Sequence, residues 1–129
     1  MNIIEQKELS LIEEFSDYEL QLLVHDEDHA IYVLEYYGFY CFLELHKSFN
    51  IIRFCLLKSK DSSRKEKVLL LINDFNKKHD LFTLYLDDEL ILLRQQLFTD
   101  NMKQALDIIY LALLLGDLRD WFTRLKDVI

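Results

Sequence analysis

Residues 62–98 carry the clearest structural signals of this sequence: SSRKEKVLLLINDFNKKHDLFTLYLDDELILLRQQLF. Its first half has the pattern of a helix, because Ser63 and Glu66 form a capping box whose side chains satisfy free backbone N–H groups. Apolar residues then recur at helical spacing: Val68, Leu71, Ile72 and Phe75. Basic residues at 77–79 stand near the C-terminal end, where the helix dipole favours cations.

The second half of the stretch predicts a β-hairpin that packs against this helix. Two apolar runs, residues 81–86 and 90–94, flank the acidic residues 87–89. Three adjacent carboxylates in a tight turn cannot surround Ca²⁺ as the spaced ligands of an EF-hand loop do, so we interpret residues 87–89 as a hairpin turn. Asn73 and Asn76 lie beside the apolar face of the helix.

Three further strands are predicted before the helix, at residues 30–36, 39–46 and 51–58. They are rich in Tyr, Phe, Val, Ile and Cys, which favour a pleated, half-buried surface. Alternation in the second strand is incomplete, because Tyr40 and Phe42 make its polar face partly apolar. That face is therefore expected to be covered by a helix or by another subunit.

The two ends of the chain are predicted to be helical. Residues 2–15 form an amphipathic helix, whereas residues 18–24 fit a strand or a helix and are interpreted as a strand or extended segment. A long helix follows the N-cap candidates at residues 99–101, and Gly116 is expected to bend or break it. This helix is apolar around much of its circumference, which indicates deep burial or contact with another chain.

The order of elements predicts an α+β fold: one helix, three strands, a helix, two strands and a helix. Hairpin-length links between the strands indicate one antiparallel sheet of about five strands with helices packed on one face. At 129 residues the chain fits a single domain, 1–129.

Composition excludes several classes of function. The net charge of −8 argues against non-specific nucleic-acid binding, and the short basic cluster at residues 58–67 is interpreted as a solvated loop and helix start. The longest apolar run, residues 108–115, is far below the roughly 20 residues that span a membrane. No signal-peptide pattern opens the chain, and Cys41 and Cys55 fit free thiols, so a cytoplasmic protein is expected.

No catalytic signature stands out in the sequence, and no cofactor or metal is predicted. The pair His25 and His29 could chelate zinc on a helix, but this short acidic segment fits a solvated turn better. Cys41 or Cys55 with His46 could form a nucleophilic pair, but both cysteines lie in apolar strands, where the pKa of a thiol is raised.

The run Val68-Leu69-Leu70-Leu71-Ile72-Asn73-Asp74-Phe75-Asn76, followed by the hairpin and the long apolar helix, resembles the YbjN family. That family is described as bacterial sensory transduction regulators. Its fold is similar to that of class I type III secretion chaperones, and the resemblance implies a chaperone-like or regulatory protein, often paired as a dimer. It has no established catalytic residues, so none are carried over. The segment 18–25 and the very apolar last helix depart from its pattern.

Taken together, the sequence predicts a non-enzymatic, homodimeric protein-interaction module that binds a partner polypeptide. Two alternatives stay open: a small-ligand or metal-dependent enzyme with a pocket between sheet and helices, and a structural subunit of a larger assembly. Aromatic residues suit a docking surface because they pack broadly, and tyrosine keeps a polar end. The predicted partner-binding residues are Tyr32, Tyr36, Tyr40, Phe42, Ile109, Leu113 and Trp121.

Overall fold

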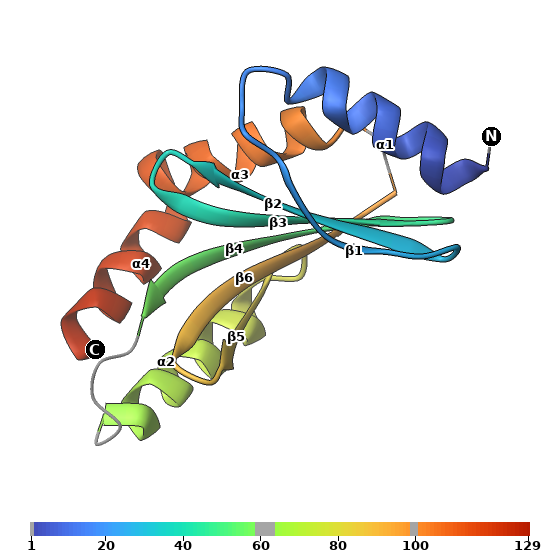
Figure 1. Cartoon of the computed structure of the whole chain (residues 1–129). Helices are drawn as coiled ribbons and strands as arrows, with labels where there is room; N and C mark the ends of the chain where they lie inside the picture. Colours follow the sequence, from blue (N-terminus) through green and yellow to red (C-terminus); the bar gives the residue numbers. More distant parts are fainter. Residues whose placement is uncertain (1, 59–63, 99–100) are drawn as a thin grey trace.

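A computed structural model describes residues 2–58, 64–98 and 101–129. Within these ranges the protein is an α+β fold with one six-stranded antiparallel sheet and four helices (Figure 1). The strands are β1 (Gln21–His25), β2 (His29–Tyr36), β3 (Phe39–His46), β4 (Asn50–Lys58), β5 (Thr83–Asp87) and β6 (Leu90–Leu97). The helices are α1 (Ile3–Glu14), α2 (Lys65–Lys78), α3 (Met102–Leu115) and α4 (Asp117–Val128).

Strands lie in the sheet in the order β1-β2-β3-β4-β6-β5. The α+β class and the antiparallel sheet are confirmed, and the predicted hairpin is the pair β5–β6. The number of strands is six rather than about five, because residues 21–25, which were predicted as a strand or extended segment, pair with β2. The last predicted helix is two helices that meet at Gly116. The predicted cap at Ser63 lies outside the described residues, and α2 begins at Lys65.

Local turn chemistry explains the two hairpins at the N-terminal end of the sheet. Tyr37 and Gly38 join β2 to β3 with φ values of 50° and 85°, the left-handed conformation that a two-residue hairpin needs at both positions. The β1–β2 turn is closed by Asp26, whose Oδ1 accepts hydrogen bonds from the backbone N–H groups of Asp28 and His29 at 2.8 and 2.9 Å.

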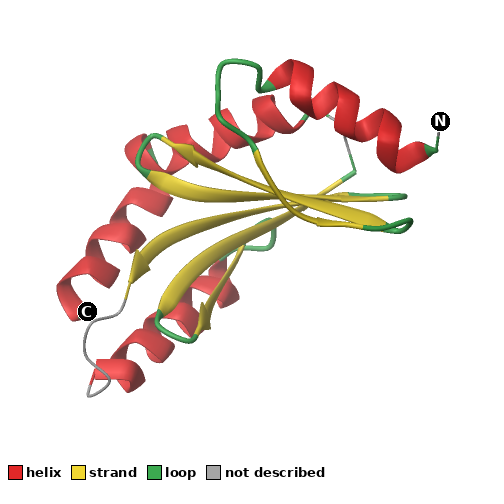
Figure 2. Ribbon diagram, in the orientation of Figure 1, coloured by secondary structure: helices red, strands yellow, loops and turns green. Residues whose placement is uncertain are grey.

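The helices pack on one face of the sheet, and the core lies between them (Figure 2). Alternation sets this face, because successive side chains of a strand point to opposite sides. Its central residues are almost completely buried: Tyr36 on β2, Cys41 and Leu43 on β3, Ile52 and Phe54 on β4, and Leu93 on β6. The opposite face carries no helix, and it presents Tyr40 and Phe42 of β3.

The sheet ends in two edge strands, β1 and β5, and among the described side chains one closes the edge at β5. Asn76 of α2 donates its Nδ2–H to the carbonyl of Leu84 and accepts from the N–H of Leu84, both at 2.8 Å. These are the bonds that a neighbouring strand would make, so the amide of Asn76 blocks further pairing at this edge.

Replacing Asn76 by alanine is expected to lower the free energy of unfolding by about 1–3 kcal/mol, because two hydrogen bonds to Leu84 are lost together. Urea unfolding followed by circular dichroism measures the change. Asn73→Ala is the matched control: Asn73 lies on the same helix and is exposed, so a change within about 0.5 kcal/mol is expected. Equal losses for the two variants would show that Asn76 does not hold this edge.

Candidate functional site

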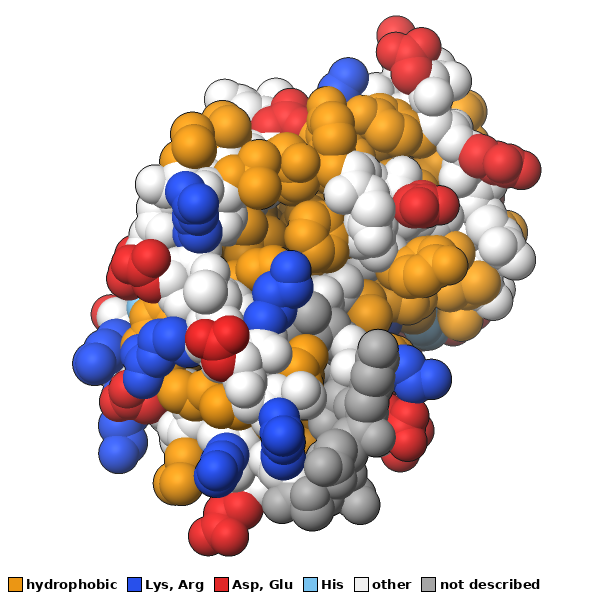
Figure 3. Space-filling model, turned by 90° about the vertical axis from the view of Figure 1, so that its left-hand side faces the viewer, with side chains coloured by type: hydrophobic (Ala, Val, Ile, Leu, Met, Phe, Trp, Pro, Cys, Tyr) orange, Lys and Arg blue, Asp and Glu red, His pale blue; other side chains and the backbone are white. Residues whose placement is uncertain are grey.

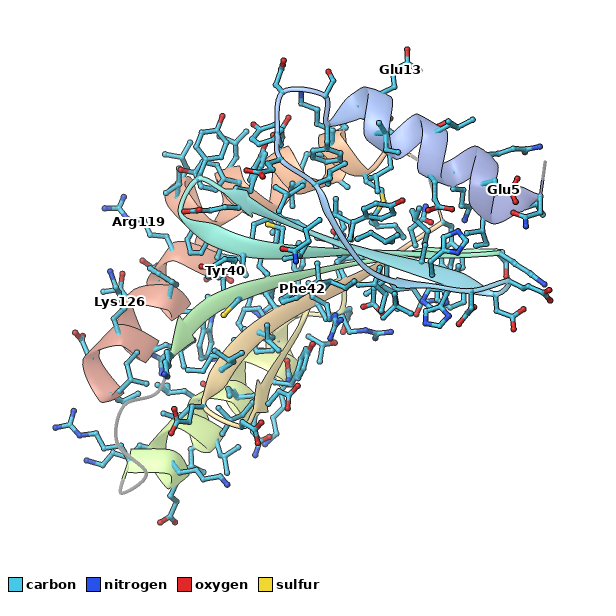
Figure 4. The ribbon with its side chains drawn as sticks, viewed as in Figure 1. Glu5, Glu13, Tyr40, Phe42, Arg119 and Lys126 are labelled. Atoms are coloured by element: carbon cyan, nitrogen blue, oxygen red, sulfur yellow. The ribbon has the colours of Figure 1, made fainter. Side chains whose placement is uncertain are left out.

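The seven predicted partner-binding residues do not form one surface. Five of them have less than a tenth of their surface exposed and belong to the core: Tyr32, Tyr36, Ile109, Leu113 and Trp121. Only the two β3 residues reach the surface, where Tyr40 is 59% exposed and Phe42 is half-buried (Figure 4). The other five residues were predicted to contact a partner, but their side chains lie in the core.

The assignment failed on α3 because this helix is apolar on several sides, so spacing alone could not say which stripe faces the sheet. The inward stripe consists of Met102, Leu106, Ile109 and Leu113, all buried. Four apolar residues remain on the outer side, and their exposed fractions are 57% for Ile108, 53% for Leu111, 42% for Leu114 and 77% for Leu115. We call these four residues the α3 stripe.

The α3 stripe continues onto the turn between β2 and β3. The ring of Tyr37 stacks on Tyr110 of α3 with centroids 4.5 Å apart, yet Tyr37 remains 62% exposed. Figure 3 shows this side of the molecule, where hydrophobic side chains gather over the upper part and charged side chains over the lower part. A contiguous apolar area of this kind is typical of a contact surface, whereas single exposed leucines are ordinary.

A second apolar surface lies on the edge strand β1. All five of its residues are exposed, including Leu22 at 48%, Leu23 at 46% and Val24 at 39%. The sequence carries a signal for this surface, since three adjacent apolar residues cannot all point inward from a strand. The signal was not decisive, because the same residues fit a helix.

A groove of about 680 Å³ lies at the start of β1, where the chain enters the sheet. Its apolar walls include Leu20, Leu22 and Val33, with Tyr40 from β3, and the carboxylates of Glu19 and Glu35 also line it. These side chains offer apolar contact and negative charge. They do not combine a nucleophile with an acid–base pair.

The histidines each have a local partner. His25 Nε2 lies 2.9 Å from Glu8 Oε1 of α1, and His29 Nδ1 lies 2.9 Å from Asp26 Oδ2. The ring of His29 stacks on His46 of β3. Across residues 2–58, 64–98 and 101–129, no group of three or more His, Cys, Asp or Glu side chains is arranged to hold a metal ion.

Cys41 does not form the nucleophilic pair with His46 that the sequence allowed. Cys41 is buried on the helix-covered face of β3, whereas His46, five residues later, is on the opposite face. Burial raises the pKa of the Cys41 thiol and also raises the pKa of Cys55, which disfavours the reactive thiolate in both. Both cysteines are free thiols.

Glu8 forms a buried polar contact that the sequence did not reveal. The hydroxyl of Tyr32 donates a hydrogen bond to Glu8 Oε2, while Glu8 Oε1 faces His25. This contact ties α1 to β1 and β2. Burial, together with the hydrogen bond to Glu8 and its negative charge, raises the pKa of Tyr32 to about 12.

The Tyr32 contact predicts a loss of stability at alkaline pH. The folded chain holds the phenol proton more tightly than the unfolded chain, whose tyrosine has a pKa near 10.0, so this contribution is complete below pH 10 and is lost towards pH 12. Urea unfolding across this range should therefore show a smaller decline in stability for Tyr32→Phe than for the parent chain. Tyr40→Phe, at an exposed position, is the control and should match the parent. An unchanged slope in Tyr32→Phe would contradict the assignment.

Two further findings concern membrane-spanning helices and similarity to known proteins. Among the described residues, every helix is too short or too polar to cross a membrane. No protein-family model matches the chain, and no curated protein is significantly similar to it.

Proposed function

We propose that this chain is a non-enzymatic protein-interaction module that pairs with a second copy and binds a partner polypeptide. The α3 stripe is the observation that carries the proposal. Its residues Ile108, Leu111 and Leu115 follow the spacing of one helix face, directly opposite the stripe that packs on the sheet. Covering the second apolar face of such a helix is favourable in water, because it removes apolar surface from solvent.

The exposed apolar residues of the α3 stripe support pairing. Two copies that meet at their α3 stripes with two-fold symmetry bury the same apolar residues from both sides.

Other features agree with this proposal. The grooves and clusters described above lack an arranged nucleophile, acid and base, and the net charge of −8 disfavours nucleic acid as the partner. Free thiols on Cys41 and Cys55 suit the reducing cytoplasm, which we propose as the location. The order of elements supports a relationship to the YbjN family, with the strand β1 and the separate helix α4 as departures.

Size-exclusion chromatography with light scattering tests the proposal. The expected result is a particle of twice the chain mass of 15.6 kDa that dissociates on dilution. A monomer at every concentration, with no bound polypeptide in a pull-down, would contradict it.

A further inference from the structure

The net negative charge of this protein comes from the N-terminal part of the chain. Residues 1–50 contain 11 of the Asp and Glu residues and 2 of the Lys and Arg residues, whereas residues 51–129 contain 12 and 13. Figure 4 shows the separation in space, with Glu5 and Glu13 on α1 and Arg119 and Lys126 on α4, at a distance from α1. The strand β1 belongs to the acidic part.

Carboxylates stand at both ends of the β1 edge. Glu19 precedes the strand and, with Glu35 of β2, lines the groove at its start. Asp26, Glu27 and Asp28 follow the strand in the β1–β2 turn, and all three are exposed. Between these charges lie the exposed Leu22, Leu23 and Val24. A ligand that matches this edge therefore needs an apolar centre and cations on both sides.

The backbone of β1 is available for pairing, unlike that of β5. Within the described residues, β1 pairs only with β2, and no side chain caps its outer edge as Asn76 caps Leu84 on β5. Natural edge strands are commonly protected by charged residues, proline, short length or a bulge; β1 has no Asp, Glu, Lys, Arg or proline, but it is short and bulged. A bulge between Leu22 and Val24 shortens the regular pairing, so this edge suits a short segment.

We propose that the free edge of β1 binds an extended segment of another protein by strand addition, and that this segment is apolar with Lys or Arg on both sides. Main-chain hydrogen bonds to β1 supply the affinity, and alternate side chains of the segment pack beside the exposed apolar side chains of β1. The cations of the segment face Glu19 at one end and residues 26–28 at the other. This inference rests on the proposed function, because it names the polypeptide that the module binds.

In the register centred on Leu23, a second copy of the chain fits this edge poorly. Antiparallel pairing of two β1 strands about Leu23 places Glu19 of one copy opposite Glu27 of the other, and the symmetry repeats the contact. Like charges directly opposite each other destabilise a sheet. The acidic residues beside β1 therefore favour a basic partner. We assign self-association to the α3 stripe instead.

Panning a random peptide library displayed on phage against the intact protein tests the inference. The expected peptides have alternating apolar residues flanked by Lys or Arg, and they slow amide hydrogen exchange at residues 21–25. Leu23→Lys should weaken the binding of a selected peptide at least about tenfold, because the new cation repels its basic flanks and blocks the edge. Leu9→Lys is the matched control, since Leu9 is an exposed leucine on α1 in the same acidic region, and it should leave binding unchanged.

Three outcomes overturn the inference: no selected peptide, selected peptides that bind Leu23→Lys as well as the parent, or protection of residues 21–25 by self-association without peptide. The last of these would make a second copy the occupant of the edge. Light scattering on the same samples separates this inference from the proposed function. If the protein is a dimer but no selected peptide binds at β1, only this inference is wrong. If the protein is a monomer and no peptide is selected, both the inference and the proposed function are wrong.

Discussion

Replacing Leu111 by glutamate is expected to convert the proposed dimer to a monomer. Leu111 is 53% exposed at the middle of the α3 stripe, so the glutamate is tolerated by the isolated chain but becomes a desolvated, unpaired charge in the proposed interface. Two-fold symmetry places the substitution in the interface twice. With about 2 kcal/mol lost at each copy, about 4 kcal/mol in total, the dissociation constant should rise roughly 1,000-fold. Sedimentation equilibrium measures this constant directly.

Leu9→Glu provides the control for this result. Leu9 is 56% exposed and belongs to α1, so the variant adds the same charge without changing a residue of the α3 stripe. Its dissociation constant should stay within a few-fold of the parent value. If Leu9→Glu separates the copies and Leu111→Glu does not, the interface lies on α1 and the assignment to α3 is wrong.

Replacing Phe54 by alanine is expected to lower the free energy of unfolding by about 3–5 kcal/mol. Phe54 is completely buried on the helix-covered face of β4, where its ring contacts Phe39 edge to face with centroids 6.0 Å apart. Truncation leaves a cavity among side chains from both the sheet and the helices. Urea unfolding followed by circular dichroism gives the change, and two-state behaviour should be retained.

Phe42→Ala is the matched substitution on the other face of the sheet. Phe42 is half-buried on β3, and its ring centroid lies 5.2 Å from the guanidinium carbon of Arg53. Arg53 Nε also lies 2.6 Å from Glu44 Oε2. Because no helix covers this face, the expected loss is about 1 kcal/mol. Similar losses for Phe42→Ala and Phe54→Ala would contradict a sheet with one buried face.

Much of the sheet could be predicted from the sequence, because its strands carry clear local signals. The acidic residues 87–89 separate two apolar runs, and Tyr37-Gly38 separates two others, so each hairpin is defined by its turn. The strand β1 lacked such a signal. Leu20, Leu22 and Val24 have the spacing of a strand, but Leu20, Leu23 and Val24 have the spacing of a helix, and pairing with β2 decided between them.

The candidate site was harder to predict than the fold. Apolar character identifies residues that avoid water, but it does not distinguish a core from a contact surface. Ile109 and Leu113 satisfy the same criterion as Ile108 and Leu111, and only the packing of α3 on the sheet separates the two pairs. Tyr40 was placed correctly on the surface because alternation along β3 opposes it to the buried Cys41.

Asn76 illustrates a second limit. The sequence places it beside the apolar face of α2, but its role depends on Leu84, eight residues later on β5. No pattern within a single helix reveals a side chain that caps the edge of a strand. The difference between the two edges of the sheet, closed at β5 and open at β1, therefore emerges only from the three-dimensional structure.

An isotope-filtered NOE experiment on a mixture of labelled and unlabelled chains tests most directly whether the α3 stripe is a contact surface. We predict NOEs from the methyl groups of Leu111 and Leu115 in one copy to protons of α3 in the other. The α3 stripe is not the contact surface if these methyl groups show no NOE to a second copy in a concentrated sample, or if the intermolecular NOEs arise from β1 instead.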